Sequence, residues 1–273
     1  MTVQGFHLTL SRMTAMDVTA STLDGLTASL SEGFYTTFST LSGGTRVLGL
    51  TAHLKRLYEP AQNLGLHPSV DSKKLREYIA ELTRQSLPNE SRLRLILTKD
   101  TGDVYIGVQP FVPTPETVYR DGVHVITREM ARHDPRIKGT DFIAQSAEQR
   151  KLVKDDIYEI LLVRHGKILE GMTSNFYAIN GKTLITAQKG ILLGVTRRAV
   201  LHLARGQGMS IEYRSPHVDE KFNEAFLTSS SRGVVPIVKI DGKPVGQGSP
   251  GVWTNTLSLA YQAYVQERSE AII

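Results

Sequence analysis

The sequence predicts an α+β protein of two lobes, and three observations lead to this prediction. Many short runs have the composition of strands, whereas only a few longer stretches repeat apolar residues at helical spacing. The segment 110–115 carries three prolines, which remove the N–H groups that helices and strands need. The length of 273 residues suits one large domain or two smaller ones. We therefore expect a small N-terminal α+β domain over residues 1–115 and a larger C-terminal domain over residues 116–273.

In the N-terminal domain, two helices are followed by two strands. Leucines three or four residues apart indicate the first helix, and Asp71 offers an N-cap for the second. The strands flank the turn 101–103 (Thr-Gly-Asp), and the first of them alternates arginine with leucine. One of these arginines, Arg92 or Arg94, can point towards a substrate carboxylate, although a solvent-facing strand also explains them. The predicted elements are helices over 51–66 and 72–85 and strands over 92–98 and 104–111.

In the C-terminal domain, strands outnumber helices. The dipeptide Asn180-Gly181 is a strong two-residue turn between strands, and His165-Gly166 marks another hairpin. Gly206 or Gly208 ends the middle helix, because glycine readily takes the left-handed conformation that follows helices. The predicted strands cover 123–128, 158–163, 167–169, 175–179, 183–186, 211–213, 224–228 and 234–240, and the predicted helices cover 146–153, 196–205 and 254–267.

Composition and charge exclude several classes of protein. The formal charge of +5 is modest and the basic residues are scattered, so we expect no nucleic-acid binding. The absence of cysteine excludes disulfides and thiolate chemistry, and the eight histidines lack the paired spacing of metal ligands. Residues 1–16 hold no apolar run long enough for a signal peptide, and no stretch approaches the roughly 18 apolar residues of a membrane span. We therefore expect a cytoplasmic protein without metal or membrane contacts.

Two polar stretches carry candidate catalytic residues. In 135–142, Lys138 lies between a proline turn and a helical segment; burial or a nearby cation lets such a lysine attack an aldehyde. A solvated loop lysine is the alternative. In 169–176, Glu170 ends a strand before a turn rich in Gly, Thr, Ser and Asn, where its carboxylate can keep a pyridine nitrogen protonated. An ordinary turn carboxylate is the alternative there.

Two further stretches suit anion binding. In 191–197, Gly194 precedes a helix that starts near Thr196, and the N–H groups at a helix N-terminus bind phosphate. Thr196 as a plain N-cap explains the same pattern. In 227–233 (Leu-Thr-Ser-Ser-Ser-Arg-Gly), hydroxyl groups follow a strand and can hold a phosphate or a carboxylate. Serine clusters also form ordinary turns.

These stretches, in this order, resemble the fold-type IV pyridoxal phosphate enzymes, which include branched-chain aminotransferase, D-amino acid aminotransferase and 4-amino-4-deoxychorismate lyase. The resemblance covers residues 31–245. The motifs occur together and in the right order, and this combination is more specific to the family than any single motif. The motifs are Gly33-Phe-Tyr-Thr-Thr37, His53-Leu-Lys-Arg56-Leu57, Glu170-Gly-Met-Thr-Ser-Asn-Phe176, Leu193-Gly-Val-Thr-Arg197 and Thr228-Ser-Ser-Ser-Arg-Gly-Val-Val-Pro236.

The resemblance implies pyridoxal 5'-phosphate as cofactor and a role for each matched residue. Lys138 would form the Schiff base and shuttle protons, Glu170 would bind the pyridine nitrogen, and Arg56 would clamp the phosphate with its planar fork of donors. The family fold is a small α+β lobe and a larger lobe built on a β-barrel-like sheet, with the cofactor between them, and its members are usually homodimers. The other implied residues are Val195, Thr196 and Ser230 at the phosphate, and Tyr35 and Ser231 near the substrate.

The sequence departs from the family pattern at three positions. Thr36 stands where many members carry an acidic residue. No tyrosine follows Lys138 within 139–143, so the bond that the branched-chain enzymes make to the cofactor's phenolic oxygen must come from another group or from water. Ser230 replaces a common threonine and keeps the hydroxyl. These departures affect the identity of the substrate more than the binding of the cofactor.

We expect an aminotransferase that moves an amino group between a small amino acid and a 2-oxo acid, with Lys138 as general base. A lyase that releases pyruvate from 4-amino-4-deoxychorismate would use the same residues. A non-catalytic protein that holds pyridoxal phosphate is the third alternative, but it need not keep both Lys138 and Glu170. D-amino acids, L-amino acids and amines all remain candidate substrates.

Overall fold

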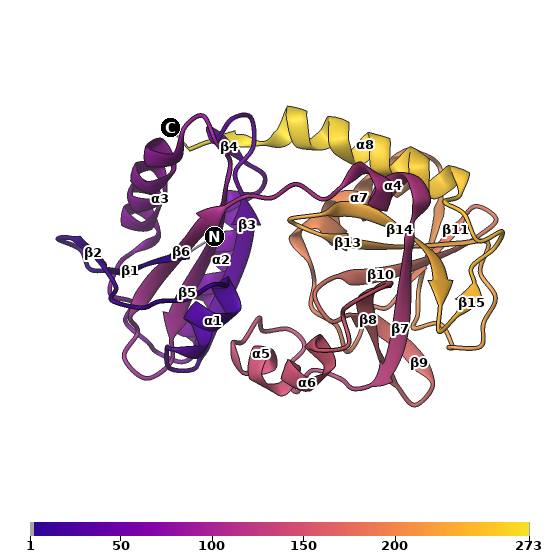
Figure 1. Ribbon diagram of the computed structural model, residues 1–273, viewed down its shortest axis with the longest axis horizontal. Helices are drawn as coiled ribbons and strands as arrows, with labels where there is room; N and C mark the ends of the chain where they lie inside the picture. The colour runs from indigo at the N-terminus through magenta and orange to yellow at the C-terminus, as the bar shows by residue number, and fades with distance from the viewer. Residues whose placement is uncertain (1–2, 273) are drawn as a thin grey trace. The chain divides into compact units, whose positions relative to one another are not determined.

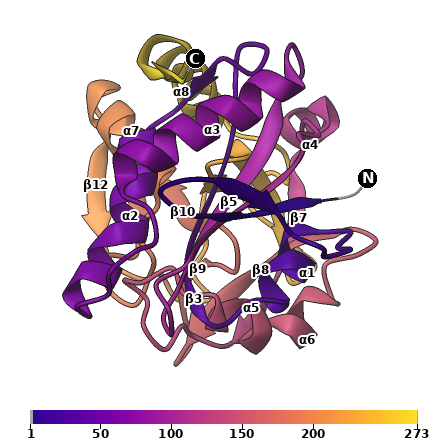
Figure 2. The ribbon, with the colours of Figure 1, turned by 90° about the vertical axis from the view of Figure 1, so that its left-hand side faces the viewer.

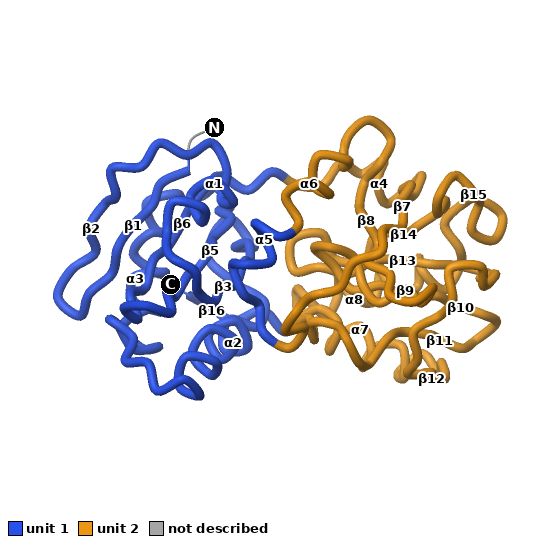
Figure 3. Tube along the Cα trace, turned by 90° about the horizontal axis from the view of Figure 1, so that it is seen from below, with its two compact units in different colours: residues 1–112, 137–145, 268–273 blue, residues 113–136, 146–267 orange. Residues whose placement is uncertain are grey.

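The computed structural model describes residues 3–272, and the chain divides into two compact units (Figure 3). The units interleave along the sequence, because the short segment that contains Lys138 belongs to unit 1 although both flanking segments belong to unit 2. The expected domains, 1–115 and 116–273, have a single boundary in the sequence instead, and this division stays a prediction. Met1, Thr2 and Ile273 lie outside the described residues. Unit 1 comprises Met1–Val112, Ile137–Gln145 and Arg268–Ile273, and unit 2 comprises Pro113–Arg136 and Ser146–Glu267.

Unit 1 is built on a five-stranded antiparallel sheet with the strand order β2-β1-β6-β5-β3. A two-stranded ribbon of β4 and β16 adds the C-terminal segment to this unit. The elements of unit 1, all labelled in Figure 1 except β16, are β1 (Gln4–Leu8), β2 (Met13–Ala15), α1 (Leu23–Ala28), β3 (Gly33–Ser39), β4 (Arg46–Val47), α2 (Leu50–Asn63), α3 (Ser72–Ser86), β5 (Ser91–Thr98), β6 (Val104–Pro110), α5 (Asp141–Gln145) and β16 (Glu270–Ala271).

One face of this sheet packs against α2 and α3 and forms the main core of unit 1 (Figure 2). Alternate strand residues such as Phe34 and Phe38 meet leucines spaced three or four apart on the helices. The predicted N-cap of α3 is confirmed, because the Asp71 carboxylate accepts a hydrogen bond from the N–H of Lys74 at 2.7 Å. The opposite face carries α1, whose Leu26 approaches Gly107 so closely that a Cβ there would lie 2.6 Å from a leucine methyl.

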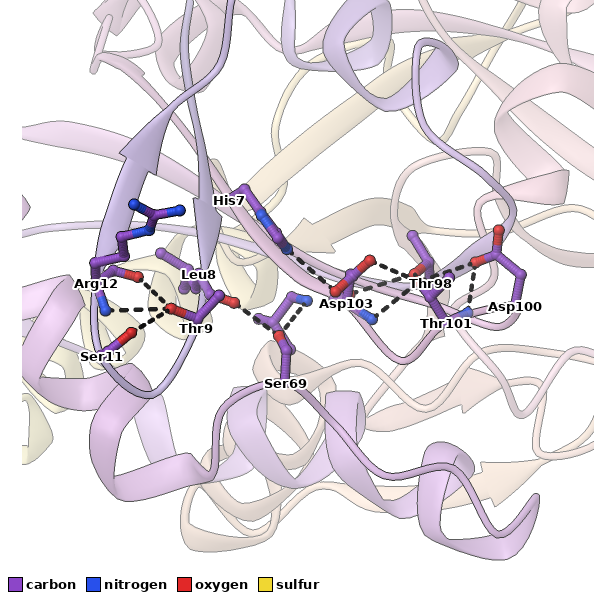
Figure 4. A network of polar contacts seen from close by, with 11 residues as sticks. His7, Leu8, Thr9, Ser11, Arg12, Ser69, Thr98, Asp100, Thr101 and Asp103 are labelled. Carbon is purple, nitrogen blue, oxygen red and sulfur yellow. Dashed lines mark hydrogen bonds and ion pairs between the residues drawn. The ribbon is translucent and has the colours of Figure 1, made fainter.

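The hairpin between β5 and β6 is tied to β1 by a network of polar side chains (Figure 4). His7 Nε2 lies 3.1 Å from Asp103 Oδ1, and the Thr101 hydroxyl donates to the other carboxylate oxygen at 2.8 Å. Gly102 has a φ of +75°, and a Cβ there would lie 2.7 Å from the backbone oxygen of His67. The predicted Thr-Gly-Asp turn is therefore confirmed, and its glycine is required by both conformation and space.

Unit 2 is built on a nine-stranded mixed sheet. Its path runs β12-β11-β10-β13-β14-β7-β8-β9, with β15 paired to β14, and the pairs β11–β12, β14–β7 and β7–β8 are parallel. The terminal strand β9 also lies against β10, which curls the sheet into a half-barrel. The elements are α4 (Glu116–Asp121), β7 (Val123–Glu129), α6 (Ala147–Arg150), β8 (Ile157–Arg164), β9 (Lys167–Gly171), β10 (Asn175–Asn180), β11 (Thr183–Thr186), α7 (Val195–Gly206), β12 (Ser210–Tyr213), β13 (Glu224–Ser229), β14 (Gly233–Ile240), β15 (Lys243–Pro244) and α8 (Val252–Arg268).

The curled sheet of unit 2 encloses its own core. Phe176 and Leu227 are both about 1% exposed, and they belong to one cluster with residues of β7, β8 and β14. Every strand predicted from the sequence of this region is present, as are the helices corresponding to α7 and α8. The helix expected over 146–153 is shorter and covers only Ala147–Arg150. None of the helices within residues 3–272 combines the length and the apolar character that crossing a bilayer requires.

Candidate functional site

Lys138 lies on a segment that extends the edge of the unit 1 sheet. The N–H of Tyr35 donates to the Lys138 carbonyl at 2.9 Å, and the N–H of Thr140 donates to the Gly33 carbonyl at 2.8 Å. The Thr140 hydroxyl oxygen also accepts a hydrogen bond from the N–H of Gly33 at 2.8 Å. These bonds form an isolated bridge beside β3 that fixes the backbone of Lys138 without a regular strand.

The side chain of Lys138 points to an aromatic ring on β3. Its Nζ lies 4.7 Å from the ring centroid of Tyr35, which is 5% exposed. The guanidinium carbon of Arg94 lies 4.8 Å from the same centroid. Arg94 is buried and bonded to Asp24 (2.6 Å), Thr27 (2.9 Å) and Thr37 (3.0 Å), so this arginine of the alternating strand does not face solvent. Tyr35 is thus flanked by two cations, which its π-system attracts.

Arg56 lies on α2, one turn after the buried histidine of the same motif. His53 is 1% exposed, and its Nδ1 is 2.6 Å from the hydroxyl of Thr36. Burial lowers the pKa of His53 to about 3, and the positive charges of Arg56 and Lys138 act in the same direction. His53 is therefore neutral at ordinary pH, and its electrostatic coupling to both cations places them in one neighbourhood of unit 1.

In unit 2, Glu170 is a buried carboxylate whose two oxygens are both bonded. Oε1 accepts from Arg132 Nε at 2.8 Å, and Oε2 accepts from the N–H of Leu192 at 3.1 Å and from Asn175 Nδ2 at 3.3 Å. Arg132 also donates to the Met172 carbonyl at 2.9 Å. Glu170 is 2% exposed, so a charged hydrogen-bonded partner is what makes its burial tolerable.

The Glu170 network continues to the N-terminus of α7. Asn175 donates to the Leu192 carbonyl at 2.8 Å and accepts from the N–H of Gly194 at 3.2 Å. Val195 is the first residue of the helix, and the described residues provide no side-chain cap at Gly194. Thr196 is 2% exposed, and its hydroxyl is 3.4 Å from that of Tyr261 rather than acting as the N-cap. The exposed partial positive charge of this helix end suits an anion.

The serine-rich stretch forms the turn between β13 and β14. Ser230 is exposed and Ser231 is half-buried. Tyr261 of α8 connects this turn with α7. Its ring lies so near Gly233 that a Cβ on that glycine would be 3.2 Å from a ring carbon, and its hydroxyl lies 3.4 Å from that of Thr196. The two stretches predicted to bind anions, 191–197 and 227–233, therefore both adjoin the side chain of Tyr261 in unit 2.

The structure divides the predicted site residues between the two units. Unit 1 holds the lysine, the aromatic ring and one arginine; unit 2 holds the carboxylate and the candidate phosphate donors. The sequence did not reveal Arg132 or the role of Asn175. Arg132 pairs with a distant residue, and the Asn175 amide joins two backbone segments, so neither interaction produces a local pattern in the sequence. The residues in unit 1 are Tyr35, Arg56 and Lys138, and those in unit 2 are Glu170, Val195, Thr196, Ser230 and Ser231.

Comparison with solved structures defines the class of protein. A Thermotoga maritima structure, solved as a candidate branched-chain amino acid aminotransferase, superposes with a TM-score of 0.81 at 25% identity and covers 97% of this chain and 96% of its own. The pyridoxal phosphate-bound form of a Mycobacterium tuberculosis aminotransferase of hypothetical function has a TM-score of 0.77 at 23% identity, with coverages of 97% and 100%. The fold is that of the fold-type IV enzymes, whose cofactor is pyridoxal phosphate.

Sequence comparison identifies the family. Residues 33–240 match the model of the amino-transferase class IV family. A D-alanine aminotransferase of Bacillus licheniformis is 29% identical over 78% of this chain and 81% of its own length. A probable branched-chain-amino-acid aminotransferase of Thermotoga maritima is 31% identical over 66% and 68%, respectively. The chain belongs to the class IV aminotransferases and is a pyridoxal phosphate-dependent aminotransferase, as the sequence motifs predicted.

The residues present fit this cofactor. Pyridoxal phosphate requires an amine for its aldehyde, a carboxylate for its ring nitrogen and donors for its phosphate. Lys138 offers the amine, and the buried Glu170 offers a carboxylate held in place by Arg132. The N-terminus of α7 and the turn at Ser230 offer phosphate donors. Within residues 3–272, by contrast, no group of three acidic or histidine side chains is arranged to hold a metal ion.

Proposed function

We propose that Lys138 carries the cofactor and moves the substrate proton. When bound, pyridoxal phosphate supplies an electron sink for the charge left on the substrate's α-carbon. Lys138 Nζ, as a neutral amine, accepts the α-proton and later delivers a proton to the former aldehyde carbon of the cofactor. The arrangement that carries this proposal is the Lys138 backbone bonded to Tyr35 and its amine placed over the Tyr35 ring.

Unit 2 supplies the complementary groups in this proposal. Glu170 holds the proton on the pyridine nitrogen, and Arg132 and Asn175 keep its carboxylate ionised and oriented. Arg56 of unit 1 clamps the phosphate with its planar fork of donors. The remaining phosphate ligands are the N–H of Val195 and the hydroxyls of Thr196 and Ser230, and Tyr35 and Ser231 lie at the substrate.

The substrates we propose are a small amino acid and a 2-oxo acid. Support comes from relatives named as D-alanine and branched-chain aminotransferases. The comparisons do not favour the lyase or the non-catalytic binding protein. We also propose a cytoplasmic homodimer, on the resemblance to family members that are usually dimers; light scattering of the purified protein measures the subunit number.

An absorption spectrum tests the central proposal. The purified protein is expected to show the visible band of lysine-bound pyridoxal phosphate, and one of D-alanine, L-alanine, L-valine or L-leucine is expected to bleach it. Lys138→Ala is expected to lose the covalent band and the turnover, whereas Lys154→Ala, a change of a lysine in unit 2, is expected to keep both. A Lys138→Ala protein with full turnover would refute the assignment, and pyruvate release without any amino acceptor would favour the lyase.

A further inference from the structure

A second ion pair lies in unit 2, separate from Arg132 and Glu170, and its carboxylate is buried. Glu159 of β8 is 2% exposed, and its Oε2 accepts from Arg232 Nη2 at 3.1 Å. The N–H of Ile160 donates to Oε1 at 3.0 Å, and the hydroxyls of Thr173 and Ser174 donate to Oε2, the latter at 3.3 Å. Glu159 is thus a buried acceptor that gathers donors from three different parts of the chain.

Arg232 is the residue that joins these parts. Besides Glu159, its Nη2 donates to Thr173 Oγ1 at 2.6 Å, and its Nε donates to Ser229 Oγ at 3.1 Å. Its guanidinium carbon lies 5.4 Å from the ring centroid of Tyr158. The Arg232 side chain is 20% exposed, and its bonded nitrogens face protein acceptors rather than solvent. A guanidinium suits this task because its planar fork can serve several acceptors at once.

Arg232 connects two loops that contain or adjoin candidate site residues. One is the loop 171–174, which directly follows Glu170, and the other is the turn 229–232, which contains Ser230 and Ser231. Gly171 allows the first loop to fold onto Glu159, because a Cβ there would collide with the Ser174 hydroxyl and lie 3.3 Å from Glu159 Cγ. The backbone oxygen of Arg232 is fixed as well, since the Tyr119 hydroxyl donates to it at 2.9 Å.

We propose that Arg232 is a positioning residue for phosphate binding: by bridging Glu159, Thr173 and Ser229, it holds the Ser230 turn in register with the loop after Glu170. This inference rests on the proposed role of Ser230 as a phosphate ligand. An exposed serine on a free turn would lose conformational freedom when it binds an anion, and a turn already fixed avoids that loss.

The test compares pyridoxal 5'-phosphate with pyridoxal, which lacks the phosphate. Cofactor-free protein is titrated with each compound, and the dissociation constant of pyridoxal divided by that of pyridoxal 5'-phosphate gives the contribution of the phosphate. Arg232→Gln is expected to reduce this ratio about tenfold, the effect of losing roughly one hydrogen bond to a charged group. Arg214→Gln removes an arginine from the Arg214–Glu220 pair in the same unit, with a nitrogen–oxygen distance of 2.6 Å, and is expected to leave the ratio unchanged.

A second variant tests the same inference if the Arg232 variant is too unstable to study. Ser229→Ala removes the contact with Arg232 Nε but retains the ion pair of Arg232 and Glu159, so it measures the loosened turn if Arg232→Gln does not fold. Its ratio is expected to fall about threefold, a partial loss of one neutral hydrogen bond. If Arg232 has only a structural role, Arg232→Gln and Ser229→Ala would lower the melting temperature but leave the ratio of dissociation constants unchanged. That result would overturn the inference.

Ser230→Ala separates this inference from the proposed function. If Ser230→Ala lowers the ratio while Arg232→Gln and Ser229→Ala do not, the turn binds phosphate without help from Arg232, and only the inference fails. If none of the three variants changes the ratio, the proposed phosphate site at Ser230 fails and takes the inference with it. A lower ratio in all three supports both.

Discussion

Glu170 and Arg132 show at the scale of single residues how a buried carboxylate is paired with a cation inside a protein. Their side chains are 2% and 4% exposed, and Arg132 Nε lies 2.8 Å from Glu170 Oε1. Burial of one unpaired charge costs far more than burial of a bonded pair. The pair therefore has to be judged as a unit: removing one partner and removing both are different experiments.

Arg132→Leu is expected to destabilise the protein by about 3–5 kcal/mol, because it leaves the Glu170 carboxylate buried without its cation. The double variant Arg132→Leu/Glu170→Leu is expected to be more stable than Arg132→Leu alone, since no charge is left unpaired. Urea unfolding of both variants and of the unaltered protein measures the difference. Equal stability of the single and double variants would show that Glu170 does not depend on Arg132.

His53 gives a second residue-scale prediction, which concerns pH. Its folded pKa of about 3 lies below its ordinary value of 6.5, so below pH 6.5 the unfolded chain binds a proton that the folded chain does not. The stabilising contribution is complete above pH 6.5 and is lost between pH 6.5 and 3, at up to ~1.4 kcal/mol per pH unit. His53 Nε2 is buried and has no hydrogen-bond partner among residues 3–272, so a proton there would be unsatisfied.

A chemical-denaturation series from pH 7.5 to 4.5 checks this prediction. The unaltered protein is expected to lose stability more steeply than His53→Gln, which has no imidazole to protonate. His202→Gln, on α7 of the other unit, is the control and is expected to follow the unaltered protein. Parallel pH profiles for the unaltered protein and His53→Gln would contradict the proposed burial of a neutral imidazole.

At the scale of elements, hydrogen bonds to β3 hold the segment that carries Lys138. Thr140 is 7% exposed, and its hydroxyl is the acceptor for the Gly33 N–H. Thr140→Val keeps the shape but leaves that N–H without its acceptor, so we expect a loss of about 1–3 kcal/mol. Thermal unfolding measures the loss, with Thr256→Val on α8, whose hydroxyl donates to the Val252 carbonyl of its own helix, as the control. An unchanged melting temperature would mean that water replaces the hydroxyl.

The elements with a clear period could be predicted from the sequence, and the others could not. The helices α2 and α3 and the hairpin of β5 and β6 follow repeats of 3.6 or 2 residues with caps or turn residues at their ends. The elements β2, α1 and α4 are only three to six residues long, so they show too few repeats to be recognised. The helix expected over 146–153 has helical spacing but ends after Arg150, because short helices gain little from their own hydrogen bonds.

At the scale of the whole molecule, motif order predicted the family and the cofactor, but long-range pairing was out of reach. Glu170 and Lys138 stand in local patterns that suggest their chemistry. Arg132, 38 residues before Glu170, and Arg232, 73 residues after Glu159, are basic residues among many others in the sequence. Their roles follow from the path of the curled sheet, which sets distant segments side by side and which no local period encodes.

The cofactor is expected to stabilise both units. If residues of each unit bind it, mass action adds ~2.7 kcal/mol to stability at a hundredfold excess over the dissociation constant. Hydrogen exchange is expected to slow in α2 of unit 1 and in α7 of unit 2 when pyridoxal phosphate is added. Inorganic phosphate at the same concentration serves as the control. Slower exchange in one unit alone would show that the other contributes no ligand.

The division of unit 1 into three sequence segments has a consequence for the newly made chain. Its strand β16 pairs with β4, and Ser269 accepts a hydrogen bond from Arg46 Nε at 2.9 Å, across 223 residues. During synthesis, residues 3–112 leave the ribosome well before the closing strand β16 has been made. The nascent N-terminal segment must therefore wait without the strand that pairs with β4, which makes it a candidate client for chaperones until translation has passed residue 271.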